Sequence, residues 1–575
     1  RLARGFGASG VVVEAWGELR VMADTTAVAD YAAALVAAED AVDPDAKPPR
    51  SGGDNTPTPL STYTEGTKTL LYIVADYPDV TGFPQTVSTI SNAMNGVTQY
   101  WDEVSYAKAR LDPTYVPSVV RLPQACSYYT NRFSQLLTDA KAAALAAGYD
   151  AANYDFYVVL TDEGAGSNNF SYAGKAWVGS PGCHLVDPYY TLRTAGHEIG
   201  HNFGLQHANS WRSDADTPIG RDSLAGGYVT NTSDAEWTEY GHRFSVMSGQ
   251  STADMSDRKA HFGPREKLRL EWIRTNEVVV LTNSAVVRLY RFDHRDATGL
   301  PRAIHINRPT ADYTSNGRMY WLGYRRAYPD NGWLQEGVQV DWVRATYGSD
   351  GAIGLDMTPF SNDSGPGSGY TFDNNDKWDG ALLIGRTYSD PTNSIHITPT
   401  ARGGAGTNEW IDVTVNIGSF PTNLPPTLSL AASTLAPTAG QLVTLTATAS
   451  DPNGDALAYE WDFGVPKSLF SNSLNRARVT NSWSAASEYV VRCVASDMRG
   501  GRASTSLVLT VGNPGTVYRI TGRVISNGLG VAGARVYTSH TNMTYTISDG
   551  SYSLVDLPAA SYTVLAQKHT STLSP

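Results

Sequence analysis

The chain is poor in cysteine, with three residues among 575: Cys126, Cys183 and Cys493. Three thiols form at most one disulfide within the chain, which excludes a small fold held together mainly by disulfides. Cys126 and Cys183 fall in the same expected domain. We expect either that these two form a disulfide or that both are buried free thiols. No cysteine precedes residue 126, so the N-terminal segment has no thiol to offer a metal ion.

Charged residues are also few, at 17%, and 44 basic against 56 acidic residues give a net charge of −12. No basic cluster is dense enough to indicate nucleic-acid binding. No apolar run approaches the ~18 residues of a membrane-spanning helix. The many Tyr, Thr, Ser, Asn and Gly residues are typical of an extracellular protein. The start at Arg1 is what we expect of a secreted chain written without its signal peptide.

One short stretch, HEIGHNFGLQH, carries the spacing of a metal site. His197 and His201 are four residues apart and therefore lie on one face of a helix. Gly204 permits a sharp turn, which brings His207 toward the same ion. Three imidazoles leave the fourth position of a zinc ion open for water, which is the arrangement of a catalytic site. Glu198 adjoins the first ligand and can take a proton from that water.

The helix that carries this motif is predicted to begin with Asp187 as its N-cap and a proline in its first turn. Apolar residues spaced three and four apart form its core-facing side: Leu192, Ala195, Ile199 and Phe203. The histidines fall outside this stripe. A chance match on an ordinary amphipathic helix is the alternative, and the added glycine and third histidine argue against it.

Further along, the stretch SVMSG places Met247 forty residues after His207. An extended histidine motif followed by such a methionine turn resembles the metzincin zinc peptidases. The texts HEIGHNFGLQHA and EYGHRFSVMSG resemble their gametolysin (autolysin) branch. The resemblance implies that His197, His201 and His207 bind zinc. It also implies that Glu198 is the catalytic residue and that Met247 forms the floor beneath the metal. The implied activity is that of a secreted metalloprotease, a hydrolase of extracellular proteins and peptides.

The sequence departs from this family at two positions. His242 stands where many gametolysin-like sequences have aspartate, and we expect it either at the polar surface or in support of the site. Gly249 stands where some metzincins have a tyrosine that helps to hold the oxyanion. Tyr240 and His242 are the nearby substitutes for that tyrosine.

The segment SYAGKAWVG is predicted to form a short strand before the motif helix. The resemblance implies an edge strand that pairs with an extended substrate through backbone hydrogen bonds. An internal strand without a ligand is the alternative. The implied substrate-binding residues are Ala173, Gly174, Lys175, Ala176 and Trp177.

Residues 66–276 are expected to form an α/β catalytic domain. Strands and helices alternate through KTLLYIVADY, TVSTISNAMNGVTQYWDEVS, VPSVVRLP, RFSQLLTDAKAAALAAG and YDFYVVLT, which predicts a mixed twisted sheet packed against the motif helix. GPREKLRLEWI, with Pro264 in its first turn, predicts the closing helix. The acidic loop after the motif either binds a structural calcium ion or is simply solvated. Its candidate ligands are Asp214, Asp216 and Asp222.

The rest of the chain predicts a multidomain protein with all-β sandwich modules. Residues 1–65 are interpreted as a pro-segment or small subdomain with a linker, or as a disordered leader. Residues 277–418 show strand patterns alone and predict a β-sandwich. Residues 425–512 contain SDPNGDALAYEWDFG and resemble a PKD-type β-sandwich with Trp461 in its core. Residues 516–575 resemble a carboxypeptidase-regulatory-like β-sandwich, which we expect to be truncated.

These β modules leave a second function open. In this alternative, the chain is an extracellular adhesion protein. Its β modules bind cell-surface or matrix ligands, and its peptidase scaffold is degenerate. The complete set of three histidines and one glutamate argues against degeneracy. A zinc enzyme that acts on a modified protein or a glycan-linked peptide is a further alternative, since the same chemistry hydrolyses other amides.

Overall fold

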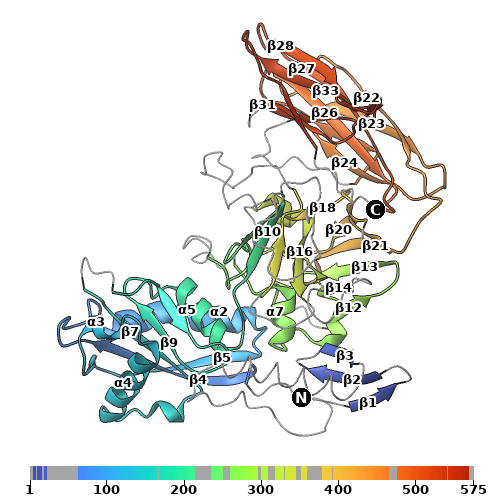
Figure 1. Cartoon of the computed structure of the whole chain (residues 1–575). Helices are drawn as coiled ribbons and strands as arrows, with labels where there is room; N and C mark the ends of the chain where they lie inside the picture. Colours follow the sequence, from blue (N-terminus) through green and yellow to red (C-terminus); the bar gives the residue numbers. More distant parts are fainter. Residues whose placement is uncertain are drawn as a thin grey trace.

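The chain is mostly β-structure with few helices, divided among several units (Figure 1). No helix in the described part of the chain is both long and apolar enough to cross a membrane. The computed structural model describes residues 4–7, 10–15, 18–22, 63–164, 169–213, 235–249, 260–295, 299–307, 318–328, 331–344, 351–358, 379–391, 393–464, 475–539 and 542–568.

The first large unit is built on a six-stranded mixed sheet. Its order is β5-β4-β7-β9-β8, with β6 paired beside β4, and β8 at the edge is antiparallel to its neighbour while the other pairs are parallel. The strands are β4 (Gly66–Asp76), β5 (Ala109–Tyr115), β6 (Val120–Arg121), β7 (Phe156–Thr161), β8 (Gly174–Ala176) and β9 (Cys183–Val186).

Helices cover both faces of this sheet. Alternate side chains of β4 point to opposite faces, so Leu70 and Tyr72 join one core and Leu71 and Ile73 the other. This double burial explains why β4 is a continuous apolar run. On the first face lie α2 (Val87–Val104) and α5 (Leu192–Asn202); on the second lie α3 (Cys126–Tyr129) and α4 (Phe133–Ala146).

The start of α5 differs from the sequence prediction. The N-cap is Thr191, whose hydroxyl accepts a hydrogen bond from the Thr194 amide, and Asp187 lies outside the helix. The Asp187 amide donates to the Thr161 carbonyl and thereby continues the pairing of β9 with β7. Strand pairing therefore holds the residues that the sequence assigned to the helix.

The predicted disulfide between Cys126 and Cys183 is wrong. Both residues are buried free thiols. Cys126 packs in the core on the α4 side of the sheet, whereas Cys183 on β9 packs in the core on the α5 side. The sheet separates the two sulfur atoms, and a disulfide requires the two side chains to face each other.

The second large unit is a sandwich of two sheets around a core that contains Trp211, Tyr320 and Trp342. One sheet has the order β11-β10-β17-β16-β15-β14-β12, with β18 paired to β16; the other has the order β13-β21-β20-β19. The strands are β10 (Asn209–Ser213), β11 (Ala235–Thr238), β12 (Val278–Leu281), β13 (Ala285–Tyr290), β14 (Ala303–Ile306), β15 (Arg318–Gly323), β16 (Gly337–Arg344), β17 (Ile353–Leu355), β18 (Leu382–Leu383), β19 (Tyr388–Asp390), β20 (Ile395–Gly403) and β21 (Trp410–Ile417).

Two strands of this sandwich come from before the expected boundary at residue 276. β10 and β11 follow the histidine motif directly, yet both belong to the sandwich sheet, where β10 pairs with β17 and β11 forms the edge beside β10. Trp211 of β10 packs against Trp342 of β16 with ring centroids 5.6 Å apart. The first unit closes with α7 (Pro264–Arg269), which begins at the predicted proline, and a short helix, α8 (Gly332–Gln335), interrupts the sandwich strands.

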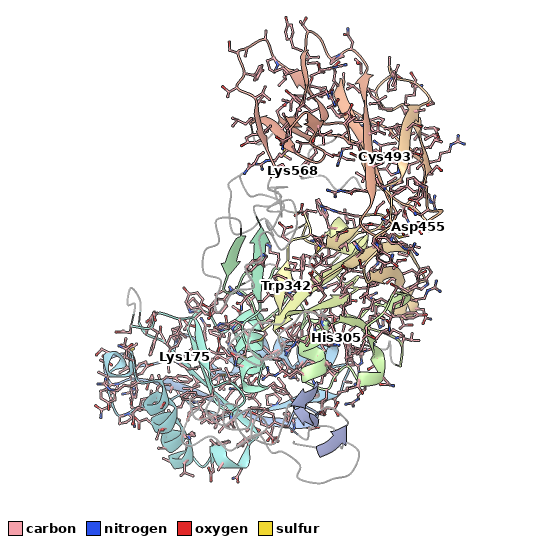
Figure 2. All side chains as sticks on the ribbon, turned by 45° about the vertical axis from the view of Figure 1, so that its right-hand side comes forward. Lys175, His305, Trp342, Asp455, Cys493 and Lys568 are labelled. Carbon is pink, nitrogen blue, oxygen red and sulfur yellow. The ribbon has the colours of Figure 1, made fainter. Side chains whose placement is uncertain are left out.

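The C-terminal part contains two smaller β units. In the first, Trp461 is buried and its ring nitrogen donates to the Arg476 carbonyl, so the expected core position is confirmed. Figure 2 locates Cys493 in this unit and Trp342 in the sandwich. One sheet of the unit that contains Trp461 consists of β22 (Thr427–Ala432), β23 (Val443–Ser450) and β25 (Arg478–Asn481). The other consists of β24 (Ala458–Asp462), β26 (Ser487–Ser496) and β27 (Arg502–Val511).

The last unit packs around Val536, Leu554 and Leu557. Its strands are β28 (Tyr518–Arg523), β29 (Ile525–Ser526), β30 (Leu529–Gly530), β31 (Arg535–Ser539), β32 (Asn542–Tyr545), β33 (Ser551–Leu557) and β34 (Leu565–Gln567). At the other end of the chain, β1 (Arg4–Gly7), β2 (Gly10–Ala15) and β3 (Glu18–Met22) form an antiparallel sheet.

Candidate metal centre

Helix α5 and the turn that follows it bring the three motif histidines together. His197 and His201 face the same side of α5 with ring centroids 4.7 Å apart. Gly204 adopts a left-handed φ of +97°, and its amide donates to the His201 carbonyl at 2.7 Å. This turn directs His207 back toward the helix. One ring nitrogen of each histidine lies within 4.8 Å of the other two.

Each of these rings is oriented by a hydrogen bond from its Nδ1 atom. Protonation at Nδ1 leaves Nε2 with a free electron pair, and such a partner fixes the tautomer and the orientation of a metal-binding imidazole. The acceptors for His197, His201 and His207 are the Val246 carbonyl at 3.1 Å, the Leu205 carbonyl at 2.7 Å and the Glu239 carboxylate at 2.8 Å, in that order.

The electrostatics keep the three imidazoles neutral near pH 7. Burial lowers the pKa of His197 well below its usual value and that of His201 to about 4. Burial also lowers the pKa of His207, although Glu239 opposes this shift. Neutral imidazoles are the form that binds zinc, so the donor set fits this ion.

Glu198 points from α5 toward the edge strand. It is 6% exposed, and burial raises the pKa of its carboxyl to about 8. A Cβ placed on Gly174 of β8 would lie 2.7 Å from both Cγ and Oε1 of Glu198. The absence of a side chain at Gly174 therefore allows β8 to pass directly over this carboxyl group.

Met247 packs against the backbone of α5 between the first two histidines. Its side chain is fully buried, and its sulfur would lie 2.5 Å from a Cβ placed on Gly200. The Met247 amide donates to Ser245 Oγ, whose hydroxyl in turn donates to the Glu266 carboxylate. The Met247 carbonyl accepts from the Ala208 amide at 2.7 Å, which links this loop to the segment after His207.

The predicted substrate-binding residues occupy the sheet edge, but they are not equivalent. Gly174, Lys175 and Ala176 form β8, which pairs on one side alone with β9 among the described strands. The Ala173 carbonyl already accepts from the Val186 amide, and the Trp177 carbonyl accepts from Asn202. The Trp177 ring packs against Phe133 inside the unit. The strand proper, with Lys175 on its exposed side, is the part available to an extended ligand.

Two residues that precede the Met247 loop contribute to the site. Glu239, which the sequence analysis missed, orients His207 as described above. Tyr240 lies with its ring centroid 3.9 Å from that of His207. It has a left-handed φ of +59°, held by hydrogen bonds from its amide to Asn209 Oδ1 and from the Gly249 amide to its carbonyl. The EYG text was the available signal, because it places a carboxylate and an aromatic ring between the third histidine and the methionine.

The expectation of His242 at the surface is wrong. It is 2% exposed, and its Nε2 atom lies 3.0 Å from the Asp341 carboxylate of β16. Its Nδ1 atom accepts from the Phe244 amide. The pairing of β10 with β17 brings the sandwich sheet against this loop and buries the imidazole. The candidate calcium ligands Asp214, Asp216 and Asp222 lie outside the described residues.

Comparison with known proteins identifies one unit of the chain. Residues 427–511 match the PKD domain family, which confirms the predicted PKD-type β-sandwich. A search of curated proteins finds no match. Among solved structures, a PKD domain of an M14-like peptidase from Thermoplasmatales archaeon SCGC AB-540-F20 is 23% identical. This match covers 16% of this chain and 99% of that chain, with a TM-score of 0.13.

Two further solved structures are similar to part of the chain. The PKD1 domain from the Vibrio cholerae metalloprotease PrtV is 23% identical over 16% of this chain and 100% of that chain, with a TM-score of 0.13. A structure described as carbohydrate-binding modules from the β-sandwich superfamily is 13% identical over 27% of this chain and 88% of that chain, with a TM-score of 0.15.

Proposed function

We propose that this chain is a secreted, zinc-dependent endopeptidase of the metzincin type, similar to the gametolysins. The observation that supports it most directly is the convergence of three neutral histidines, each with its Nδ1 atom hydrogen-bonded, next to a buried glutamate. The PKD domain at residues 427–511 is consistent with an extracellular peptidase. In this proposal, residues 66–276 supply the catalytic unit, and residues 516–575 form a carboxypeptidase-regulatory-like module.

The three histidines, Glu198 and strand β8 have separate roles in the proposed reaction. His197, His201 and His207 would hold the zinc ion, which supplies Lewis acidity toward a peptide carbonyl and a water molecule. Glu198 moves the proton: its ionised carboxylate can accept a proton from the attacking water and return it to the leaving amine. The backbone of β8 aligns an extended peptide beside Glu198.

The test is to measure metal content and cleavage of casein together. We expect about one zinc ion per chain and cleavage that 1,10-phenanthroline abolishes. Glu198→Ala should retain zinc and lose activity by at least about 10²-fold, since proton transfer contributes 10²–10⁴-fold. His201→Ala should lose both zinc and activity.

A matched control is Asp112→Ala, which removes an exposed carboxylate on β5, at the opposite edge of the sheet from β8. It should leave both zinc content and cleavage unchanged. Full activity in Glu198→Ala would contradict the proposed mechanism. A chain that binds no zinc would contradict the proposed function as a whole.

A further inference from the structure

An arginine lies one helical turn before the first metal-site histidine. Arg193 is in the first turn of α5, four residues before His197, and so shares its face of the helix. Its positive charge contributes to the lowered pKa of His197, after burial and the other two histidines. Arg193 therefore lies beside the site, on the same face of α5 as the histidines.

The guanidinium group of Arg193 lies on the side of the site formed by the Met247 loop. Its Nη2 atom lies 3.9 Å from a Cβ placed on Gly249, and Cβ of Tyr240 lies 3.2 Å from the same point. The Tyr240 ring in turn packs over His207. Glu198, by contrast, faces β8 on the other side. Arg193 and Tyr240 thus form one wall of the site, and β8 forms the opposite one.

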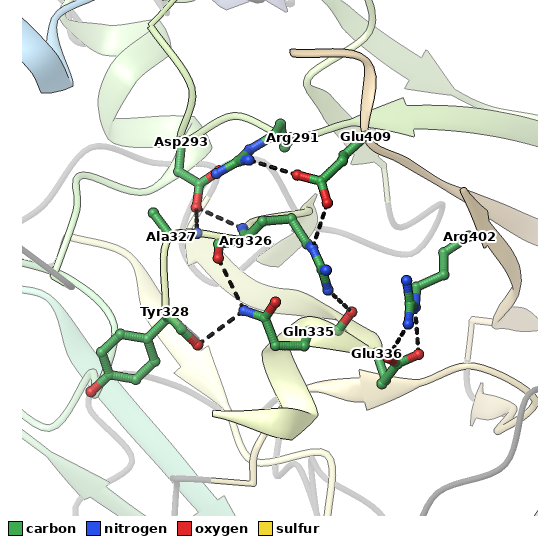
Figure 3. Close-up of polar contacts among 9 residues, drawn as sticks. All are labelled: Arg291, Asp293, Arg326, Ala327, Tyr328, Gln335, Glu336, Arg402 and Glu409. Carbon is green, nitrogen blue, oxygen red and sulfur yellow. Dashed lines mark hydrogen bonds and ion pairs between the residues drawn. The ribbon is translucent and has the colours of Figure 1, made fainter. Parts of the chain in front are cut away.

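Among the described residues, Arg193 has no acidic partner. Within the part of the chain that the structure describes, no carboxylate lies within ion-pair distance of its guanidinium, although the side chain is partly buried and burial lowers its pKa. Elsewhere several arginines are paired with carboxylates. Figure 3 shows Arg291 and Arg326 bound to Glu409, and Arg402 bound to Glu336. A partly buried cation without a partner is unfavourable unless a ligand completes it.

We propose that Arg193 binds a carboxylate of the substrate and makes the site selective for acidic peptides. This inference rests on the proposed peptidase function. The planar guanidinium offers two parallel N–H donors, which match the two oxygens of a carboxylate. The carboxylate comes from an aspartate or glutamate side chain or from the C-terminus of the peptide. Gly249, which has no side chain, leaves the space beside the guanidinium open for it.

The experiment compares the full-length chain with Arg193→Gln and Arg193→Glu on paired fluorogenic peptides. The peptides of the first set have both ends blocked, and the two members of a pair differ by glutamate or glutamine at one position. A second set has a free C-terminal carboxylate and is compared with the same sequences blocked at that end. We expect wild type to favour the acidic member by about tenfold or more in kcat/KM, as for a hydrogen-bonded ion pair. Arg193→Gln should abolish the preference, and Arg193→Glu should reverse it in favour of the glutamine member.

The arms of the experiment distinguish the two sources of the carboxylate. Preference within the blocked peptides identifies a side chain, and preference confined to the free C-terminus identifies the chain end. The matched control is Arg110→Gln on β5, whose side chain is 67% exposed at the opposite sheet edge, and it should keep the wild-type preference. A wild type without preference, or an Arg193→Gln variant that retains it, would overturn the proposal.

A binding measurement separates this inference from the proposed function. In the Glu198→Ala background the same peptide pairs are titrated calorimetrically without turnover. The acidic peptide should bind about tenfold more tightly, and the difference should decrease with added salt because an ion pair that is partly open to solvent is screened. If wild type cleaves no peptide, the proposed function fails. The binding ratio still decides the role of Arg193, and equal affinities would refute it.

Discussion

The contact between Gly174 and Glu198 leads to a quantitative prediction for Gly174→Ala. The added Cβ would lie 2.7 Å from Cγ and Oε1 of Glu198 and 2.8 Å from Cγ2 of Thr194. Carbon atoms pack at about 3.5–4.0 Å, so β8 or the carboxyl group must move by about 1 Å. A displacement of that size at a reacting group costs about 10²-fold in rate, or ~2.7 kcal/mol. Overpacking adds about 1–3 kcal/mol of destabilisation.

The assay for Gly174→Ala measures kcat/KM on one peptide, zinc content and thermal unfolding. We expect kcat/KM to fall about 100-fold while zinc content is unchanged, because no histidine is displaced. Gly96→Ala is the matched control: it lies in α2, and no atom lies within 4 Å of the added Cβ. It should keep full activity and gain up to about 1 kcal/mol of stability. If Gly174→Ala retains kcat/KM within about threefold of wild type, the close approach of β8 does not position Glu198.

Two further predictions concern the surroundings of the site. Glu239→Ala should weaken zinc binding by about tenfold. This is the lower end of the effect for such supporting carboxylates, because the Glu239 side chain is 52% exposed and water can replace it. Zinc transfer to a chelator of known affinity measures the change, and wild-type affinity would refute the prediction. His184 is fully buried, and burial lowers its pKa from 6.5 to about 3. In the unfolded chain, His184 therefore takes up a proton below pH 6.5, whereas in the folded chain it does not. The free energy of unfolding consequently falls as the pH drops from about 6.5 to about 3. The loss at pH 5 is about 2 kcal/mol; urea unfolding at pH 7 and pH 5 should show a smaller loss for His184→Gln, and an equal loss would count against this assignment.

The sequence predicted those helices and strands whose apolar pattern lies within a single continuous segment. The apolar stripe of α5 packs as expected, with Ala195, Ile199 and Phe203 buried in the core. The motif spacing sufficed to bring the three histidines together, because helix geometry and one glycine turn determine their positions. The long apolar run of β4 was likewise identifiable from its composition alone.

Features that depend on distant pairing could not be predicted in this way. Strand β5 reads ARLDPTY, a polar sequence with a proline, and it forms because β4 offers a parallel edge. His242 was expected either at the surface or in support of the site, and the residues around it in the sequence do not reveal its distant partner. Its burial comes from Asp341, almost a hundred residues away. The EYG text signals a carboxylate at Glu239, but its contact with His207 depends on where the Gly204 turn directs that ring.

The third histidine has a backbone anchor far downstream. The Gly351 amide donates to the His207 carbonyl at 3.1 Å, and the Asn209 amide donates to the Ala352 carbonyl at 2.8 Å. A ribosome adds about 5–20 residues per second, so roughly 7–30 s separate the synthesis of His207 from that of its anchor. During that interval the growing chain has the complete motif but lacks the partner that fixes its last ligand. Its own sandwich domain therefore delays the proposed activity until most of the molecule has been made.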